Sequence, residues 1–160
     1  MPDYAAMKTE LALPENAALT DEQIAANWEV PFDVVVDVPV ASIEAFLRSR
    51  LLTGGMKRFV TTPDEAATVE QVDGVSELLD LINSSNASSV RMTDPTVAAT
   101  LEAVYDTMVQ FAMMTGTQEA ELLALGVNTT TKAAQLGLTA DVHDTVSEIA
   151  AARIWPGVSP

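Results

Sequence analysis

The chain has 160 residues, and its Asp and Glu outnumber its Lys and Arg by 23 to 8, which gives a formal net charge of −15. Binding to phosphates requires a basic surface, so this balance argues against a nucleic-acid partner and an anionic membrane surface. Cysteine is absent, which excludes disulfides, thiolate catalysis and cysteine-based metal sites. The length predicts a single domain over residues 1–160.

The acidity has three explanations that the sequence leaves open. It keeps the fold soluble, it suits a saline environment, or it complements a basic partner surface. The opening residues, MPDYAAMKTE, lack the basic and apolar stretches of a signal peptide, and no apolar run approaches the length of a membrane span. We therefore expect a protein that has no membrane partner.

The N-terminal residues predict a helical arm over residues 1–30. Asp3 can cap a short helix that ends near Leu11, and Pro14 breaks the pattern. The capping box Thr20-Asp21-Glu22-Gln23 begins a second helix that runs to about Trp28. Trp28 lies one turn after Ile24, and we interpret the tryptophan first as a packing residue.

The segment 31–40, PFDVVVDVPV, has the period of a half-buried strand. Its apolar positions alternate with Asp33 and Asp37, and prolines bracket it, as is typical of a sheet edge or a ribbon near residues 32–38. One strand needs a partner, which is either a weaker strand such as 57–61 or a strand of another chain. The second option suits an assembly protein.

The middle of the chain predicts two further helices. The first covers about 41–52, and Gly54-Gly55 is expected to end it. Half of the basic residues lie here, at Arg48, Arg50, Lys57 and Arg58. These residues could form a patch that binds an acidic partner. We prefer the alternative, in which they neutralise the helix dipole and form salt bridges with nearby carboxylates. The second helix is expected to begin at a capping box, Thr62-Pro63-Asp64-Glu65, and to end near Asn83, before a polar loop over 84–89. Asp73-Gly74 either divides this segment into two helices or is tolerated within one, at a cost of about 1 kcal/mol.

The segment 94–116, DPTVAATLEAVYDTMVQFAMMTG, predicts the central helix of the fold, over about residues 95–114. Its apolar residues recur at steps of three and four, Asp94 can cap its start and Gly116 can close its end. Short helices are expected from Thr117, from Thr129-Thr130-Thr131 to Gly137, and from Asp144. An extended segment is expected over 139–142, and Val146, Ile149 and Ala150 are expected to face inward on the last helix. An apolar tail over 154–160 then either folds onto its own core or docks on a neighbour. We predict a mainly α fold of short helices around the 95–114 helix, with a minor β element.

The residue types that carry chemistry are sparse. His143 is the only histidine, and no nucleophile or second ligand stands at a suitable spacing from it. Asp33 with Asp37, and Asp64 with Glu65, have ordinary roles at a strand edge and in a first helical turn, so we expect no metal site there. We predict a protein that is not an enzyme and uses no cofactor or metal. The candidate interface residues are instead apolar, namely Val34, Val36, Val38, Trp28 and Trp155.

Both ends of the chain carry patterns that resemble a group of small tailed-phage proteins. That group begins with a Tyr-Ala-x-Leu/Met-Lys-x-Glu-Leu helix followed by a Thr-Asp turn and a second short helix. The residues that match this opening are Tyr4, Lys8, Glu10, Leu11, Leu19, Thr20 and Asp21. Its C-terminal pattern is a Ser-Arg-Ala-x-x-Leu-Gly-Leu turn and a final helix that ends in Ala-Ala-Arg. The matching residues are 131–138, where Thr-Lys replaces Ser-Arg, and 151–153.

The resemblance covers roughly half of the chain, and it includes no catalytic motif. It implies a structural or accessory component of a phage particle, made in the host cytoplasm and held in the virion by contacts with other virion proteins, in several symmetric copies. Decoration of the capsid and association with the tail or its fibres both remain open. The alternative is a soluble acidic chaperone or regulator that acts during assembly and is then released.

Overall fold

The computed structural model describes residues 1–84, 88–138 and 142–157, and the described chain is mainly α-helical, with 63% of residues in helices. This confirms the predicted fold class. The chain divides into two compact units, where the sequence predicts one domain. Unit 1 is formed by Met1–Val34 and Thr129–Pro160, and unit 2 by Val35–Asn128.

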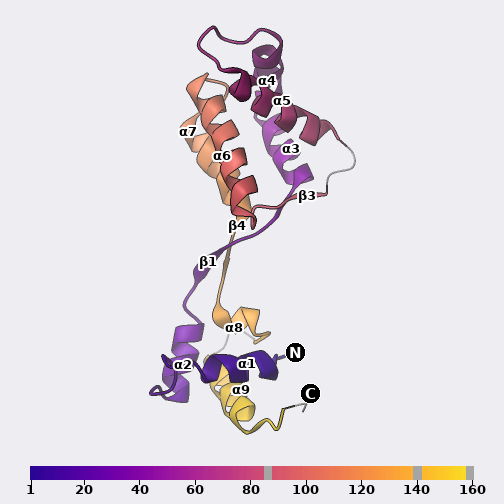
Figure 1. Cartoon of the computed structure of the whole chain (residues 1–160). Coiled ribbons are helices and arrows are strands. Elements are labelled where there is room, and N and C mark those ends of the chain that lie inside the picture. The colour runs from indigo at the N-terminus through magenta and orange to yellow at the C-terminus, as the bar shows by residue number, and fades with distance from the viewer. Residues whose placement is uncertain (85–87, 139–141, 158–160) are drawn as a thin grey trace. The chain divides into compact units, whose positions relative to one another are not determined.

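Unit 1 joins the two ends of the chain (Figure 1). Its helices are α1 (Tyr4–Leu11), α2 (Asp21–Trp28), α8 (Lys132–Gln135) and α9 (Val142–Ile154). Asp3 caps α1, and Thr20 with Gln23 forms a complete capping box at α2, both as predicted. The predicted N-terminal arm thus consists of α1 and α2, and both helices pack against α9. The core of the unit is made by Met7, Leu11, Ile24, Ala25, Trp28, Ala133, Leu136, Ile149 and Ala152.

The described residues of unit 2 form five α-helices, and each of them contacts the next one in sequence (Figure 1). These helices are α3 (Val40–Ser49), α4 (Leu52–Thr61), α5 (Val69–Asn83), α6 (Pro95–Gln110) and α7 (Gly116–Leu123), and the 3-10 helix η1 (Ala124–Gly126) follows. α6 is the longest helix of the described chain and carries the buried Leu101, Tyr105 and Met108. The predicted central helix is therefore present, with its Asp94 cap and Pro95 at the first position.

The predicted strand region forms two short strands, and both find partners within the chain. β1 (Phe32–Val35) pairs with β4 (Val127–Thr130), and β2 (Val38–Pro39) pairs antiparallel with β3 (Ser89–Val90). The alternative partner over 57–61 is wrong, because those residues belong to α4. A strand from another chain is not needed for this pairing.

Two glycines were predicted to end the helix over about 41–52, and they lie inside the following helix instead. Gly54 and Gly55 belong to α4, which continues to Thr61 and buries Met56 and Phe59. The break falls earlier, at Leu51, whose φ of 59° and ψ of 25° are left-handed. The reason is tertiary packing: the α4 stripe gains more from burying large apolar side chains than two glycines cost in helix propensity.

The capping signal at Thr62 is also not used as predicted. α5 begins at Val69, after a complete capping box formed by Thr68 and Gln71, and Thr62 is the C-terminal cap residue of α4. Asp64 instead accepts a hydrogen bond from the N–H of Ala66 in the connecting turn, at 2.9 Å. The same residue pattern thus occurs twice, and the second copy places Val75, Leu78, Leu79 and Ile82 inward.

The central helix ends at Gln110, four residues before the predicted end. Ala112 has a left-handed φ of 53°, and Gly116 is the first residue of α7 and not the end of α6. Thr115 and Gln118 form a capping box that starts α7. This signal is present in the sequence, and the continuous apolar pattern of 111–114 conceals it.

The last third of the chain has the predicted short helices, but Val127–Thr130 forms the strand β4, where Thr129 and Thr130 were predicted to open a helix. Thr131 caps the one-turn helix α8, and Gly137 follows it with a φ of 74°. α9 begins at Val142, so the extended segment expected over 139–142 falls mostly on residues 139–141, which lie outside the described residues, as do 85–87 of the serine loop. On α9, Ile149 is buried as predicted, while Ala150 is exposed and Thr145 and Ala152 are buried in its place. Among the described helices, none has both the length and the apolar character of a membrane span.

Candidate interaction site

The candidate interface residues of the sequence are divided between cores and surfaces. Trp28 and Val38 are buried in the cores of unit 1 and unit 2, so they stabilise their own units and present no surface. Val34 and Val36 are half-buried. The exposed apolar side chains of β1 and β4 are instead residues outside the predicted interface set, namely Phe32 at 39%, Val35 at 56% and Val127 at 44% exposure.

Trp155 lies against α1 in unit 1. Its ring centroid is 6.2 Å from that of Tyr4, and its carbonyl oxygen accepts a hydrogen bond from Lys8 Nζ at 2.9 Å. The side chain is half-buried. The described part of the predicted tail therefore folds back onto its own unit at Trp155, while Ile154 is exposed and residues 158–160 lie outside the described residues.

The residues considered for chemistry are held in ordinary structural contacts. His143 is exposed on α9. Asp33 accepts a hydrogen bond from Thr129 Oγ1 at 2.7 Å, and Asp37 accepts one from Thr93 Oγ1 at 2.7 Å. Within the described ranges no group of three or more His, Asp or Glu side chains could hold a metal ion.

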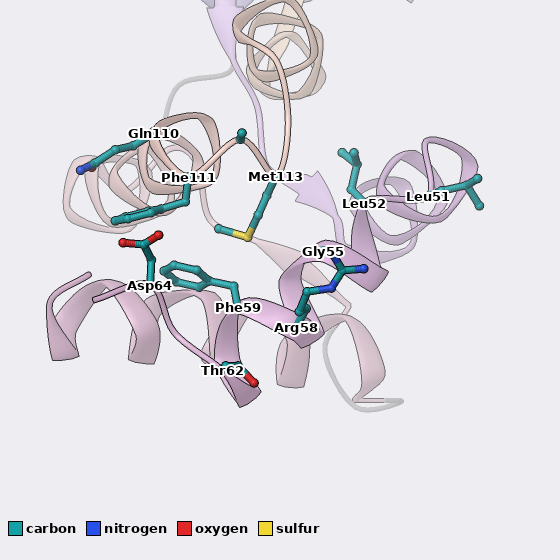
Figure 2. A pocket seen from close by; sticks show the side chains of 11 residues that line it. Leu51, Leu52, Gly55, Arg58, Phe59, Thr62, Asp64, Gln110, Phe111 and Met113 are labelled. Atoms are coloured by element: carbon teal, nitrogen blue, oxygen red, sulfur yellow. The ribbon is translucent and has the colours of Figure 1, made fainter. Parts of the chain in front are cut away.

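An open cleft of about 530 Å³ lies on unit 2, between α4 and the turn that joins α6 to α7. Its apolar walls are Leu52, Phe59, Phe111 and Met113, and Figure 2 shows the two phenylalanine rings facing each other beside the sulfur of Met113. The ring centroids are 4.9 Å apart and the planes are inclined by 40°. This tilted arrangement is favourable for aromatic rings and makes a firm floor for an apolar side chain.

Left-handed backbone at non-glycine residues occurs on two sides of this cleft. Leu51 and Ala112 line it, and in the described part of the chain they are the non-glycine residues with a positive φ. Such a conformation costs an L-residue about 1–2 kcal/mol, and such costs are concentrated at functional sites in proteins. Leu51 also exposes 85% of its surface at the edge of the cleft.

The rim of the cleft carries one charge of each sign. Arg58 and Asp64 lie to either side of the Phe59 ring in Figure 2. Arg58 belongs to none of the ion pairs that the described residues form, whereas Arg48 pairs with Glu44 and Arg50 with Glu121. The basic cluster noted in the sequence is thus half neutralised, as we preferred, and its other half, Lys57 and Arg58, is left exposed on α4.

The cleft was not predicted from the sequence. The left-handed residues that frame it are a leucine and an alanine, which carry no sequence signal for that conformation. Its walls come from helices that were expected to end elsewhere. No protein-family model, curated protein or solved structure matches the chain.

Proposed function

We propose that the protein is a non-enzymatic component of a tailed-phage particle that acts through contacts with other virion proteins. The observation that supports this most is the arrangement of the residues that resemble phage proteins. They come from the two ends of the sequence, and they belong to the same compact unit. A shared folded module accounts for two separate patterns better than coincidence does.

The matched residues also bond to one another across the unit. Glu10 of the N-terminal pattern pairs with Lys132 of the C-terminal pattern at 2.7 Å, and Asp21 pairs with Arg153 at 2.7 Å. The Tyr4 hydroxyl donates a short hydrogen bond to the carboxylate of Glu148. These positions are thus tied by structural contacts, which is the role expected of residues that define a fold and not a catalytic centre.

Unit 2 supplies the contact surface in this proposal. An apolar side chain of a neighbouring protein would lie in the cleft against the packed rings of Phe59 and Phe111, with Arg58 and Asp64 fixing its orientation. The exposed Leu51 would be covered by the same neighbour, which offsets the free energy of holding it in water and in a left-handed turn. Several symmetric copies of the protein would repeat this contact around the particle.

The decisive experiment is mass spectrometry of particles purified on a density gradient from the phage that encodes this chain. We expect the chain to follow the major capsid or tail proteins through the gradient at a constant ratio. A chain that is present in the lysate and missing from the purified particles would exclude a virion component.

The contribution of the cleft is tested by replacing Leu51 with Asn, which tolerates the left-handed conformation and removes the exposed apolar surface. The purified variant should be at least as stable as the parent, and its amount in particles should fall. The matched control is Val69→Asn, since Val69 is also an exposed apolar residue of unit 2 but lies away from the cleft. Equal incorporation of both variants would exclude the cleft as the contact surface.

The surface carboxylates of unit 2 favour a second candidate, an acidic assembly chaperone that shields a basic partner and is then released. This candidate predicts the reverse distribution, with the chain bound to a virion protein in the lysate and absent from mature particles. The gradient experiment separates the two functions.

A further inference from the structure

A groove runs between α5 and α6 on unit 2. The two helices approach closely at Gly74, where an added Cβ atom would lie 2.9 Å from Cγ2 of Val104. Two open hollows of about 320 Å³ and 660 Å³ lie along this contact, and both are lined by Gly74, Glu77, Thr96, Thr100 and Val104. The glycine therefore brings the helices together and leaves the groove above them unfilled.

The floor of the groove is made of small side chains. Thr96, Ala99, Thr100 and Ala103 of α6 are exposed, and their spacing of three and four places them on one face of the helix. Long side chains hold packed helices apart, and small ones allow a close approach. A second helix can therefore approach this face closely, up to the end of the groove where Gln71 of α5 donates a hydrogen bond to Gln110 of α6 at 3.0 Å.

Both sides of the floor carry carboxylates. Glu70, Asp73 and Glu77 of α5 line the groove on one side, again at a spacing of three and four. Glu102 and Asp106 follow the small residues on the other side of α6 by the same helical spacing. All five are exposed, and the ion pairs found in the described ranges involve other carboxylates. Burial raises the pKa of Glu119 on α7, and a hydrogen bond with Asp106 and the charges of Asp106 and Glu102 raise it further, so these carboxylates lie close together.

The negative charge of the groove indicates which kind of molecule can bind there. Nucleic acid is repelled by the carboxylates, and a second copy of the chain cannot supply a row of cations. Of the eight Lys and Arg residues, four are in ion pairs and Lys8 is bonded to a carbonyl oxygen. Three remain. Lys57 and Arg58 are adjacent in sequence and point about 100° apart on α4, and Arg91 lies between β3 and α6, so the three form no row.

We propose that the α5–α6 groove binds an amphipathic helix of a different protein, one that places small apolar residues on the floor and Lys or Arg against the two rows of carboxylates. This names the chemistry of a partner and rests on the protein-binding role proposed above. The spacing of the α5 acids implies basic residues at steps of three and four along the bound helix.

The test uses the purified full chain and three fluorescent synthetic peptides of about 18 residues, which is five helical turns. The first has an Ala-rich face flanked by Lys at steps of three and four. The second has the same composition with Lys distributed around the helix, and the third has Glu in place of Lys. We expect the first peptide to bind in a fluorescence-anisotropy titration at low ionic strength, the second to bind much more weakly and the third not at all.

Paired variants locate the binding. Asp73→Asn with Glu77→Gln should weaken binding of the first peptide by roughly five- to tenfold, the effect of two exposed charge pairs. The matched control, Glu15→Gln with Glu65→Gln, removes the same charge from exposed carboxylates outside the groove and should change binding by less than about twofold. Ala103→Gln should block the floor, while Ala120→Gln on α7 should not. Circular dichroism and thermal unfolding verify that each variant is folded.

Equal binding of the first two peptides, or an equal loss in the two charge variants, would show attraction by net charge alone and overturn the proposal. Failure of the first peptide to bind the parent chain would also overturn it. Self-association of the parent chain that Ala103→Gln abolishes would assign the groove to a second copy and not to a basic helix. These outcomes are separate from the gradient experiment, because peptide binding can hold for a chain that never enters the particle.

Discussion

Gly74 shows how a single hydrogen atom in place of a side chain sets the distance between two helices. A helical glycine costs about 1 kcal/mol relative to alanine, so replacing one usually stabilises a helix. Here the new side chain would meet the stiff, β-branched Val104 at 2.9 Å. We expect Gly74→Val to lower the free energy of unfolding by about 2 kcal/mol through overpacking, measured by urea denaturation.

The control for Gly74→Val is Gly54→Val, since Gly54 is also helical and an added Cβ atom there meets nothing within 4 Å. This variant should leave the free energy of unfolding unchanged or slightly raised. Adding Val104→Ala to Gly74→Val should restore part of the loss, because the two side chains compete for one space. Equal losses at the two glycines would mean that helix propensity, and not the α5–α6 contact, governs both positions.

Asp37 provides a second test at the scale of a residue. The hydroxyl of Thr93 and then its backbone N–H donate to the carboxylate, and both hydrogen bonds lower the pKa of Asp37 below its ordinary 3.8. A lowered pKa means that this contact stabilises unit 2 above pH 3.8, the ordinary value, and that the contribution is lost as the pH falls through the pKa of the folded state. Thr93→Ala should raise the pKa of Asp37 toward its ordinary value in an NMR titration of the carboxyl carbon. Thr129→Ala, which removes the corresponding partner of Asp33, should leave Asp37 unchanged.

At the scale of an element, two copies of one capping pattern compete for the start of α5. Thr68 Oγ1 accepts a hydrogen bond from the N–H of Gln71, and Gln71 Oε1 accepts one from the N–H of Thr68, whereas Thr62 is in the turn after α4. Thr68→Ala should therefore lower the free energy of unfolding by about 1 kcal/mol, as is typical of a lost N-cap. Chemical denaturation of Thr68→Ala and Thr62→Ala compares the two sites directly. Thr62→Ala should be nearly neutral, and a larger loss at Thr62 would place the helix start where the sequence first suggests it.

At the scale of the whole molecule, charge repulsion opposes folding. The chain carries 23 acidic and 8 basic side chains, and the ion pairs of the described residues are at least partly exposed, which makes each worth little. Raising the NaCl concentration from about 0.1 M to about 1 M shortens the screening length from about 10 Å to about 3 Å. We expect the thermal unfolding midpoint to rise over this range, since screening relieves more repulsion than attraction.

The salt dependence of peptide binding should be opposite to that of stability. Binding of a basic helix in the α5–α6 groove should weaken over the same range, because the rows of carboxylates attract their partner through exposed charges. Stability and binding are therefore expected to respond to salt in opposite directions. A midpoint that falls with NaCl would show that attractive pairs, and not repulsion, dominate the electrostatics of the folded chain.

The sequence by itself determined the elements whose signals are local. The caps at Asp3, Thr20, Asp94 and Thr131 are where the residues predict them, because a side-chain acceptor two or three residues before a free N–H needs no distant partner. The amphipathic period of α6 is equally local. The mainly α fold and the burial of Trp28 and Ile149 follow from the same periodicity.

Tertiary structure alone decided what depends on residues far apart in the chain. The side chains that pack against each turn decide whether Gly54-Gly55 ends a helix, which of two capping boxes is used and where α6 ends. No local signal predicts that residues 32–35 pair with 127–130 or that the two ends of the chain join in one unit. The same is true of the cleft framed by Leu51 and Ala112 and of the groove at Gly74. Local patterns specify how a segment folds against its immediate neighbours, whereas surfaces that bind other molecules arise where segments distant in sequence meet.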